Sequence, residues 1–266
     1  MKLIHAMTAL TLLVLAGCHD GKTAKHQVEP DMEEEPLPER FENDDLPKAA
    51  DELFDDFMYY FASNEDLQRR RITFPLPIDT GEVTEAEWQM DPFFTEAGQY
   101  TLIFNTAEER ELENDTTINE VVVEKIFLTE DSVKQYRFLR EEGRWHLTAI
   151  SRQSLGENAN AAFLKFYQKF ATDSIFQQKS LMSEIEFTGP DPDDDFAEME
   201  GFITPDSWEA FAPELPCNTI YNIVYRQQPS RTKEKVFVIC GISNGMETEL
   251  TFRQVRGRWK LAKLNE

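Results

Sequence analysis

Gly-Arg-Trp-Lys-Leu at residues 257–261 reveals the organisation of the chain, because almost the same five residues, Gly-Arg-Trp-His-Leu, occur at residues 143–147. The shift is 114 positions (143 to 257), and residues 123–150 align with residues 237–264 without a gap. An earlier set of residues recurs at a shift of 109 positions (54 to 163): Phe54, Phe57, Phe61, Ala62 and Gln68 return as Phe163, Phe166, Phe170, Ala171 and Gln177. Two landmarks in the same order predict a duplicated domain.

Length and composition are consistent with two ordinary domains. A repeat of about 110 residues suits one compact domain, and a chain of 266 residues holds two such repeats with extra segments. Hydrophobic residues make up 41% of the chain and include 20 phenylalanines, so each repeat can fill a core. The formal net charge of -23 repels phosphate backbones and argues against a nucleic-acid partner.

Residues 1–17 read as a secretion signal. Lys2 supplies a positive start and an apolar run follows. As a helix the run Leu3–Gly17 is about 22 Å long, which is too short to span an apolar membrane core of about 30 Å. The ending Leu-Ala-Gly-Cys at residues 15–18 resembles the lipobox of bacterial lipoproteins, which implies cleavage before Cys18 and lipidation of its thiol. A plain signal with an accidental cysteine is the alternative.

Residues 18–48 read as an acidic, flexible tether. The segment contains prolines and the run Glu33–Glu35 and almost no large apolar residues, so it cannot bury enough surface to fold. An aspartate after the lipidated cysteine holds lipoproteins at the inner membrane, and here His19 follows Cys18. We therefore expect a chain anchored in the cell envelope through Cys18, at the outer membrane, with its face of the membrane left open.

The first repeat is expected at residues 49–155 and the second at residues 156–266. In the first, apolar residues at helical spacing predict a helix over residues 53–61, and a second short helix follows through residue 71. Strands are predicted at residues 100–104, 121–128, 133–139 and 145–150. The second repeat shows the same order, with strands at 184–187, 219–225, 236–242, 247–253 and 259–264. Helices followed by mostly antiparallel strands predict an α+β fold.

This organisation resembles the cone-shaped domains of the nuclear transport factor 2 superfamily. Together with the lipobox, the Ile-Thr-Phe-Pro-Leu-Pro stretch at 72–77 and the closing Gly-Arg-Trp, it is similar to a family of uncharacterised lipoproteins from gut-dwelling Gram-negative bacteria. The resemblance implies two tandem cone-like repeats, each a helix pair packed on a curved antiparallel sheet. Some superfamily members are isomerases or dehydratases and others are binding modules, so the fold alone decides no function.

Few residues in the repeats suit catalysis. His146 is the only histidine in either predicted repeat, and its counterpart in the second repeat is Lys260. The acidic run 191–195 lacks the glycine and glutamate of a helix-loop-helix calcium loop. The sequence contains no phosphate loop, zinc-spaced ligand set or nucleophile elbow. We therefore expect no cofactor, metal or catalytic residue, and a module that binds a protein or glycan partner. The alternative is a small-molecule enzyme that uses carboxylates inside one cone.

Two covalent features are also predicted. Residues 219–225 and 236–242 read as the arms of a hairpin, which would bring Cys217 and Cys240 together as a cross-strand disulfide in an oxidising envelope; two buried thiols are the alternative. Three Asp-Ser/Thr stretches look like acceptors of envelope O-glycosylation in the suspected source group, at Thr116, Ser132 and Ser174. Ser132, beside a predicted hairpin turn, is expected to be the best exposed of the three.

Overall fold

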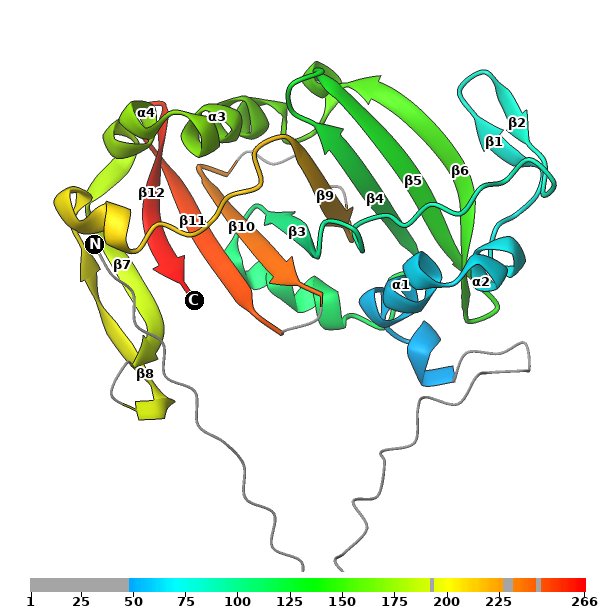
Figure 1. Cartoon of the computed structure of the whole chain (residues 1–266), viewed down its shortest axis with the longest axis horizontal. Coiled ribbons are helices and arrows are strands. Elements are labelled where there is room, and N and C mark those ends of the chain that lie inside the picture. Colours follow the sequence, from blue (N-terminus) through cyan, green and yellow to red (C-terminus); the bar gives the residue numbers. More distant parts are fainter. Residues whose placement is uncertain (1–47, 192–193, 227–231, 243–244) are drawn as a thin grey trace, which may run out of the picture. The chain divides into compact units, whose positions relative to one another are not determined.

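The computed structural model describes residues 48–191, 194–226, 232–242 and 245–266, which belong to one unit of the chain, and Figure 1 shows their arrangement. The helices, with η marking 3₁₀ turns, are η1 (Lys48–Asp51), α1 (Phe54–Ser63), α2 (Glu65–Arg70), η2 (Ala107–Asn114), η3 (Leu155–Glu157), α3 (Ala161–Thr172), α4 (Ser174–Lys179) and η4 (Pro205–Ala210). The strands of the first half are β1 (Leu76–Ile78), β2 (Gly81–Val83), β3 (Gln99–Phe104), β4 (Glu120–Phe127), β5 (Ser132–Glu141) and β6 (Arg144–Ser154). Those of the second half are β7 (Leu181–Asp191), β8 (Asp194–Ile203), β9 (Thr219–Val224), β10 (Glu234–Gly241), β11 (Glu247–Val255) and β12 (Arg258–Asn265).

Strands from both halves share one sheet. Among the described residues ten strands follow the order β6-β5-β4-β9-β3-β10-β11-β12-β7-β8, and β1 and β2 form a separate hairpin. The α+β class is confirmed, whereas two tandem cones with a sheet each are not. The sheet is also mixed, since β3 pairs with β9 and β7 pairs with β12 in parallel. The predicted boundary between residues 155 and 156 stays a prediction, and the sheet runs across it.

The two halves exchange one strand each. The shift of 114 positions carries β4 onto β10 end to end (120 to 234 and 127 to 241), so each should pair with the strand before it in its own half. Instead β4 pairs with β9, with Val122 opposite Val224, and β10 pairs with β3, with Val236 opposite Phe104. Both pairings are antiparallel and have matching registers. The exchange therefore follows the internal repeat.

The exchanged region is buried on both faces. Neighbouring residues of a strand point to opposite sides of a sheet. On β10, Val236, Val238 and Cys240 belong to a first hydrophobic core, which includes α1 and α2. Phe237 and Ile239 belong to a second core, which includes α3. The two helix pairs therefore cover opposite faces of the sheet, α1 and α2 beside β4–β6 and α3 and α4 beside β10–β12 (Figure 1).

Each core is organised around one phenylalanine of the sheet. Phe138 of β5 lies within 5.2, 6.0 and 5.3 Å, ring centroid to ring centroid, of three rings of α1: Phe54, Phe57 and Phe61. Phe252 of β11 lies within 5.4, 5.6 and 5.1 Å of three rings of α3: Phe163, Phe166 and Phe170. Tilted and edge-on aromatic pairs add about 0.5–1.5 kcal/mol each to the burial of their area. The repeated phenylalanines in the sequence are therefore core-building residues.

A glutamine braces each helix pair, Gln68 buried and Gln177 half-buried. Gln68 Nε2 donates to the carbonyl of Phe61 at 2.9 Å, and its Oε1 accepts from the indole of Trp88 at 3.2 Å. Gln177 makes the same two bonds, to the carbonyl of Phe170 at 3.1 Å and from the indole of Trp208 at 2.9 Å. The brace explains why a polar residue recurs among the repeated phenylalanines.

Insertions distinguish the halves. Trp88 lies 20 residues after Gln68, whereas Trp208 lies 31 residues after Gln177, because the second half carries the long hairpin β7–β8. The first half has the longer connection between its exchanged strand and the next strand, and that connection contains η2. Neither β8 nor η2 was predicted from the sequence. Residues 191–195 and 107–114 are so rich in acidic residues that no regular spacing of apolar residues can be recognised there.

The hydrogen bonds of Gln68 should contribute measurably to the stability of the fold. Gln68→Leu leaves the Trp88 indole and the Phe61 carbonyl without their partner, together with the backbone N–H and C=O of Asp91, which also bond Gln68 at 3.0 and 2.7 Å. A buried group that loses its partner costs about 1–3 kcal/mol. We expect the free energy of unfolding in urea to fall by about 3 kcal/mol or more. The exposed control Gln89→Leu should change it by about 0.5 kcal/mol at most; equal losses in both variants would contradict the brace.

Candidate functional site

Aromatic side chains fill the space between each helix pair and the sheet. The largest side chains with less than 2% exposure are Trp145, Trp208, Tyr136, Tyr167, Phe57, Phe61, Phe93, Phe138, Phe163, Phe170, Phe237 and Phe252. These described side chains occupy that space, so chemistry must be sought at the margins of the cores.

One aspartate-tyrosine pair lies at the edge of the first core. The Tyr136 hydroxyl donates to the Asp91 carboxylate, and the Tyr136 ring lies 4.7 Å from the ring of Phe93. Burial raises the pKa of the Tyr136 hydroxyl far above its usual range, and the negative charge of Asp91 adds to the rise. A hydroxyl that stays protonated and already donates to a carboxylate fixes the loop before β3 to β5. We interpret this pair as structural.

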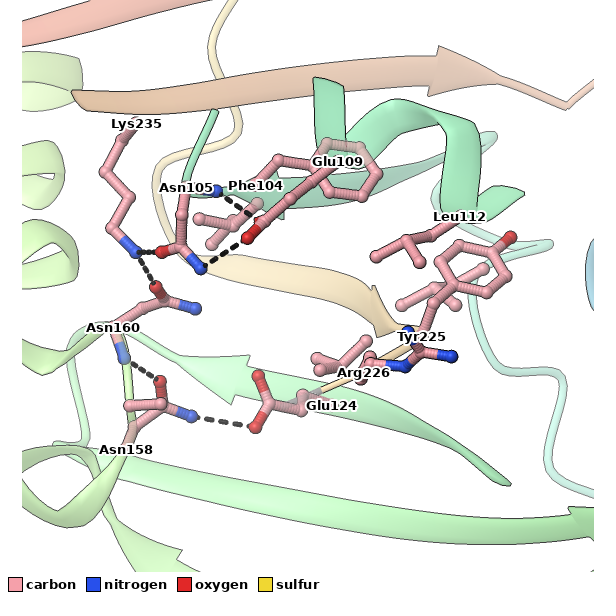
Figure 2. A pocket seen from close by; sticks show the side chains of 14 residues that line it. Phe104, Asn105, Glu109, Leu112, Glu124, Asn158, Asn160, Tyr225, Arg226 and Lys235 are labelled. Carbon is pink, nitrogen blue, oxygen red and sulfur yellow. Dashed lines mark hydrogen bonds between the residues drawn. The ribbon is translucent and has the colours of Figure 1, made fainter. Parts of the chain in front are cut away.

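A polar pocket lies at the seam, which we define as the region where β4, β9, β3 and β10 lie side by side. The parallel pairing of β3 and β9 is limited to Thr101–Asn222 and Leu102–Ile223. The pocket is lined by residues at and just beyond the end of this pairing. They include Ile103 and Phe104 of β3 and Ile223 and Val224 of β9. The pocket therefore forms where the two exchanged strands separate, and Figure 2 shows its side chains.

Lys235 occupies one end of the seam pocket. It lies at the start of β10 and is 6% exposed. Its Nζ donates to the side-chain oxygens of Asn105 and Asn160, at 2.6 Å each, and Asn105 in turn donates to the Glu109 carboxylate from its backbone N at 2.7 Å (Figure 2). Burial lowers the pKa of Lys235 to about 8, against the opposing charge of Glu109. The Lys235 ammonium is therefore bonded directly to two asparagine amides. The Glu109 carboxylate reaches it only indirectly, through Asn105.

Glu124 of β4 occupies the other end and is 1% exposed. Its Oε1 accepts from the amides of Asn158 at 2.8 Å and Gln135 at 3.0 Å, and its Oε2 accepts from Asn222 at 3.2 Å. Burial raises the pKa of the Glu124 carboxyl, and the three amide donors oppose the rise. Because Asn222 lies on the exchanged strand β9, the carboxylate ties the two halves together.

The volume of the seam pocket limits its chemistry. The cavity measures about 30 Å³, and a water molecule needs about 10–15 Å³ measured in this way. Sites for small organic ligands are commonly about 300–1,000 Å³. The seam pocket therefore suits a water molecule or two between the lysine and the glutamate, and it is too small for an organic substrate.

His146 and its counterpart serve the packing of the sheet margin. His146 of β6 is half-buried, and burial followed by the charge of Arg71 lowers the pKa of its imidazole. Lys260 of β12 donates to the backbone carbonyls of Lys179 at 3.0 Å and Leu181 at 2.9 Å, where α4 ends. Lys260 thus satisfies the last carbonyl of α4, which the helix itself leaves without a donor, and the first carbonyl of β7.

The predicted disulfide does not form in the structure. Cys217 and Cys240 are both free, Cys240 buried and Cys217 half-buried. The hairpin on which the prediction rested is absent, because β3 lies between β9 and β10. Cys240 faces the first core, whereas Cys217 lies beside Tyr167 of α3 in the second core. The thiols therefore belong to opposite faces of the sheet, beyond the reach of a disulfide.

The three candidate glycosylation residues differ in exposure. Thr116 and Ser174 are exposed, while Ser132 is only half-buried at the start of β5, so the expectation that Ser132 is the best exposed was wrong. Ser174 is the first residue of α4, and the neighbouring Asp173 carboxylate caps that helix by accepting from Phe176 N at 2.9 Å.

The remaining sequence features give no metal or membrane site in the described residues. Asp191 and Asp194 face each other across the hairpin β7–β8, while residues 192–193 lie outside the description. In the described part of the chain no group of three or more histidine, cysteine, aspartate or glutamate side chains is placed to hold a metal ion. No described helix has the length and apolar character needed to cross a membrane. Cys18 and the predicted tether lie outside the described residues, apart from Lys48.

The two buried charges of the seam, Glu124 and Lys235, are not among the residues predicted from the sequence. Glu124 interrupts the apolar run Val121–Phe127, and Lys235 directly precedes the apolar run Val236–Cys240. A charged residue inside or beside a run buried on both faces is the signal that could have marked them. Their partners Asn105, Asn158 and Asn160 could not be found in this way, because they come from loops that only the fold brings together.

Comparisons with known proteins agree with the fold. The family model described as a domain of unknown function (DUF4348) matches residues 33–266. The structure is similar to the crystal structure of an NTF2-like protein from Bacteroides fragilis, with a TM-score of 0.75 and 39% sequence identity. The match covers 83% of this chain and 98% of that chain. A search of curated proteins found no significant match.

The buried lysine should leave a pH signature. Between the folded pKa of about 8 and the ordinary value of 10.5, the unfolded chain binds more protons than the folded one, so the free energy of unfolding rises with pH. The destabilisation by Lys235 is thus fully present below pH 8 and is relieved above it. From about pH 7 to about pH 9.5 the wild type should gain about 2 kcal/mol relative to Lys235→Met.

Urea unfolding at both pH values measures this difference. Lys233→Met is the matched control, because it removes the same charge from an exposed position two residues away. Its profile should parallel that of the wild type. A Lys235→Met profile that also runs parallel to the wild type would show that the ammonium is not buried at the seam.

Proposed function

We propose a binding function for this chain, which belongs to the family of the domain of unknown function DUF4348 and has an NTF2-like fold like its Bacteroides fragilis relative. The protein is a non-catalytic module of the cell envelope that binds a ligand or partner. The filling of both helix–sheet interiors by aromatic side chains of the described residues carries the proposal, because these side chains occupy the space in which a substrate would otherwise lie. What the module binds must therefore contact its outer surface or the margins of its cores.

The two halves support this proposal as copies of one cone-like repeat. Both keep the phenylalanine cluster, the Gln–Trp brace and the strand order, which build the core. The matching polar side chains Gln68 and Gln177 serve the fold, whereas the histidine of the repeats is not kept, since His146 aligns with Lys260. Selection on a shared catalytic site would be expected to retain matching polar groups, whereas the halves share only the means of folding. The exchanged strands join them into one continuous sheet.

We propose that the module is anchored to a membrane by lipid at Cys18. The lipobox-like residues 15–18 and the acidic, proline-containing segment up to residue 48 support this arrangement. Several acyl chains hold a protein at a membrane where one does not. Anchoring concentrates the binding surface at that membrane, so that weak contacts gain from effective concentration. The outer membrane is the proposed site, and the bound partner is a protein or a glycan.

The alternative is a small-molecule enzyme that uses carboxylates of one cone. It requires an ionisable group that is essential for function without being essential for folding. His146 is the histidine of the described part that such a mechanism would recruit. Complementation of a deletion strain distinguishes the two functions. A substitution that removes a catalytic group abolishes the function of an enzyme but not that of a binding module.

Anchoring can be tested in a deletion strain complemented with the full chain. Cys18→Ala should move the protein from the membrane fraction to the soluble fraction and abolish complementation at equal abundance. His146→Gln should remain in the membrane fraction and complement fully. Complementation by soluble Cys18→Ala would refute the anchored module. Loss of complementation by folded, abundant His146→Gln would favour the enzyme.

We also propose O-glycosylation at the exposed positions Thr116 and Ser174, with Ser132 the least accessible candidate. The intact mass of the native, delipidated protein should exceed that of the bare chain. Thr116→Val and Ser174→Ala should each remove one increment, whereas Ser132→Ala should remove none or the smallest fraction. A native mass equal to that of the bare chain would exclude the modification.

A further inference from the structure

An open pocket lies at the mouth of the first core, where α1 meets the exchanged strands. It has a volume of about 210 Å³, which is below the range of drug-sized sites and well above that of a water molecule. We call it the mouth pocket and define it by its lining residues: Asp55, Asp56, Tyr59, Phe94, Tyr100, Ile223, Gly241 and Ile242.

Asp55 is the unusual member of the mouth pocket. It lies in the first turn of α1, and its Oδ1 is buried without a hydrogen-bond partner among the described residues. Burial raises the pKa of the Asp55 carboxyl, the neighbouring charge of Asp56 adds to the rise, and the backbone N–H groups of Asp55 and Asp56 oppose it. Leaving a buried carboxylate oxygen without a donor destabilises a fold. A group retained at such a cost calls for a reason outside folding.

The second half provides an internal control for Asp55. Asn64 and Asp173 cap α2 and α4 through equivalent bonds, to Leu67 N and Phe176 N at 2.9 Å each, which fixes a shift of 109 positions between the helix pairs. The same shift carries Asp55 onto Leu164 (55 to 164), which is 0% exposed in the second core. The fold therefore accepts a buried leucine at this position, so the carboxylate is not needed to build the helix pair.

Two further positions of this region show the same substitution. Tyr100 of β3 corresponds to Ile220 of β9 at the shift that carries β3 onto β9 (99 to 219). Cys240 of β10 corresponds to Ile126 of β4 at the shift of 114 positions (126 to 240). Ile220 and Ile126 are buried in the second core. In the first core the tyrosine and the cysteine instead lie opposite each other on β3 and β10, beside the pocket. The polar mouth is thus particular to the first core.

The surroundings of the mouth pocket are negative. In the described part of the chain no lysine or arginine lines it, whereas Asp55 and Asp56 do. Arg110 of η2, whose charge acts on Cys240, is already paired with Glu247 at 2.6 Å and Glu249 at 3.0 Å. Glu113, whose charge acts on Tyr100, is bonded to the same arginine. Such a cluster attracts cations.

The lining distinguishes organic cations from metal ions. A calcium or magnesium ion takes six or more oxygen ligands, and magnesium keeps several as water. The mouth pocket offers two carboxylates, and its remaining walls include the aromatic residues Tyr59, Phe94 and Tyr100. Aromatic faces attract ammonium groups, with a gain of about 0.5–2 kcal/mol that grows as water is excluded. Carboxylates with aromatic walls therefore suit an alkylammonium group.

We infer that the mouth pocket binds an alkylammonium group, with the Asp55 carboxylate as its counter-ion and the aromatic residues as its walls. The inference rests on the proposed binding function and names its ligand class. The group comes either from a free amine or from a lysine side chain of a partner, and both present the same –CH₂–NH₃⁺ end. The Asp55 carboxylate then gains a positive partner, which no lysine or arginine among the described lining residues provides.

Ionisation argues against catalysis at this pocket. Burial raises the pKa of the Cys240 thiol to about 12, and it raises the pKa of the Tyr100 hydroxyl well above its usual range. The reactive form of a cysteine is its thiolate. Both groups stay protonated near neutral pH, so the pocket has a carboxylate without an activated nucleophile beside it. Binding, not turnover, is the chemistry that these groups support.

Calorimetric titration of the full-length chain tests the inference with three probes. Putrescine represents a free amine, a blocked lysine peptide represents a protein side chain, and the same peptide with acetylated lysine removes the charge. We expect saturable binding of putrescine or of the lysine peptide and none of the acetylated peptide. The tighter of the first two identifies the source of the ammonium group. No binding tighter than about 1 mM for either cation would overturn the inference.

Variants connect the binding to the pocket. Asp55→Asn keeps the shape and removes the charge, so it should weaken binding at least tenfold, and Asp55→Leu, which copies the second half, should abolish it. Asp66→Asn is the matched control, because it removes an exposed carboxylate of α2 that does not line the pocket. Equal affinities of Asp55→Asn and the wild type would overturn the inference, as would displacement of the amine by equimolar calcium.

The outcome is independent of the anchoring experiment. If Cys18→Ala loses complementation and Asp55→Leu complements fully, the binding module stands and the mouth pocket is not its site. If Asp55→Asn abolishes complementation and amine binding together, both inferences are supported. Chemical conversion of a bound amine by the wild type, lost in Asp55→Asn, would overturn both in favour of an enzyme.

Discussion

The parallel pairing of β3 with β9 is the contact on which the rest of the structure depends. Each strand lies between strands of the other half, so neither half completes its sheet alone. The two exchanged pairings, β4 with β9 and β10 with β3, have equivalent registers in the internal repeat. The same strand contact is therefore made twice, once by each half. It also places the two helix pairs on opposite faces, and the central strands must be apolar on both sides. The apolar run of β10 meets that demand.

Polar chemistry collects where this pairing ends. Beyond Leu102 and Ile223 the two strands separate, and the gap is filled by amides that hold Lys235 at one end and Glu124 at the other (Figure 2). A buried charge is costly unless hydrogen bonds satisfy it. At the seam those bonds come from loops of both halves. The pocket is thus better understood as a polar joint between the two halves, which agrees with its small volume.

Duplication separates what folding needs from what function needs. The phenylalanines around Phe138 and Phe252 and the two glutamine braces are kept in both halves, because each core would fail without them. Asp55 is kept in one half only, where its counterpart Leu164 shows that the fold does not require it. A polar group that an otherwise equivalent site replaces with a buried aliphatic residue is a stronger indication of function than a polar group considered alone.

By itself the sequence determined the α+β class, the repeat and most strand positions, since these follow from local periodicity and from residues that recur at fixed shifts. It also identified the core phenylalanines. Only the tertiary structure decided which strands pair, because β4 with β9 and β4 with its own β3 satisfy the same local pattern. The disulfide prediction failed for that reason. The seam amides and the mouth pocket likewise depend on long-range pairing, which brings Asp55, Tyr100 and Cys240 together from separate parts of the chain.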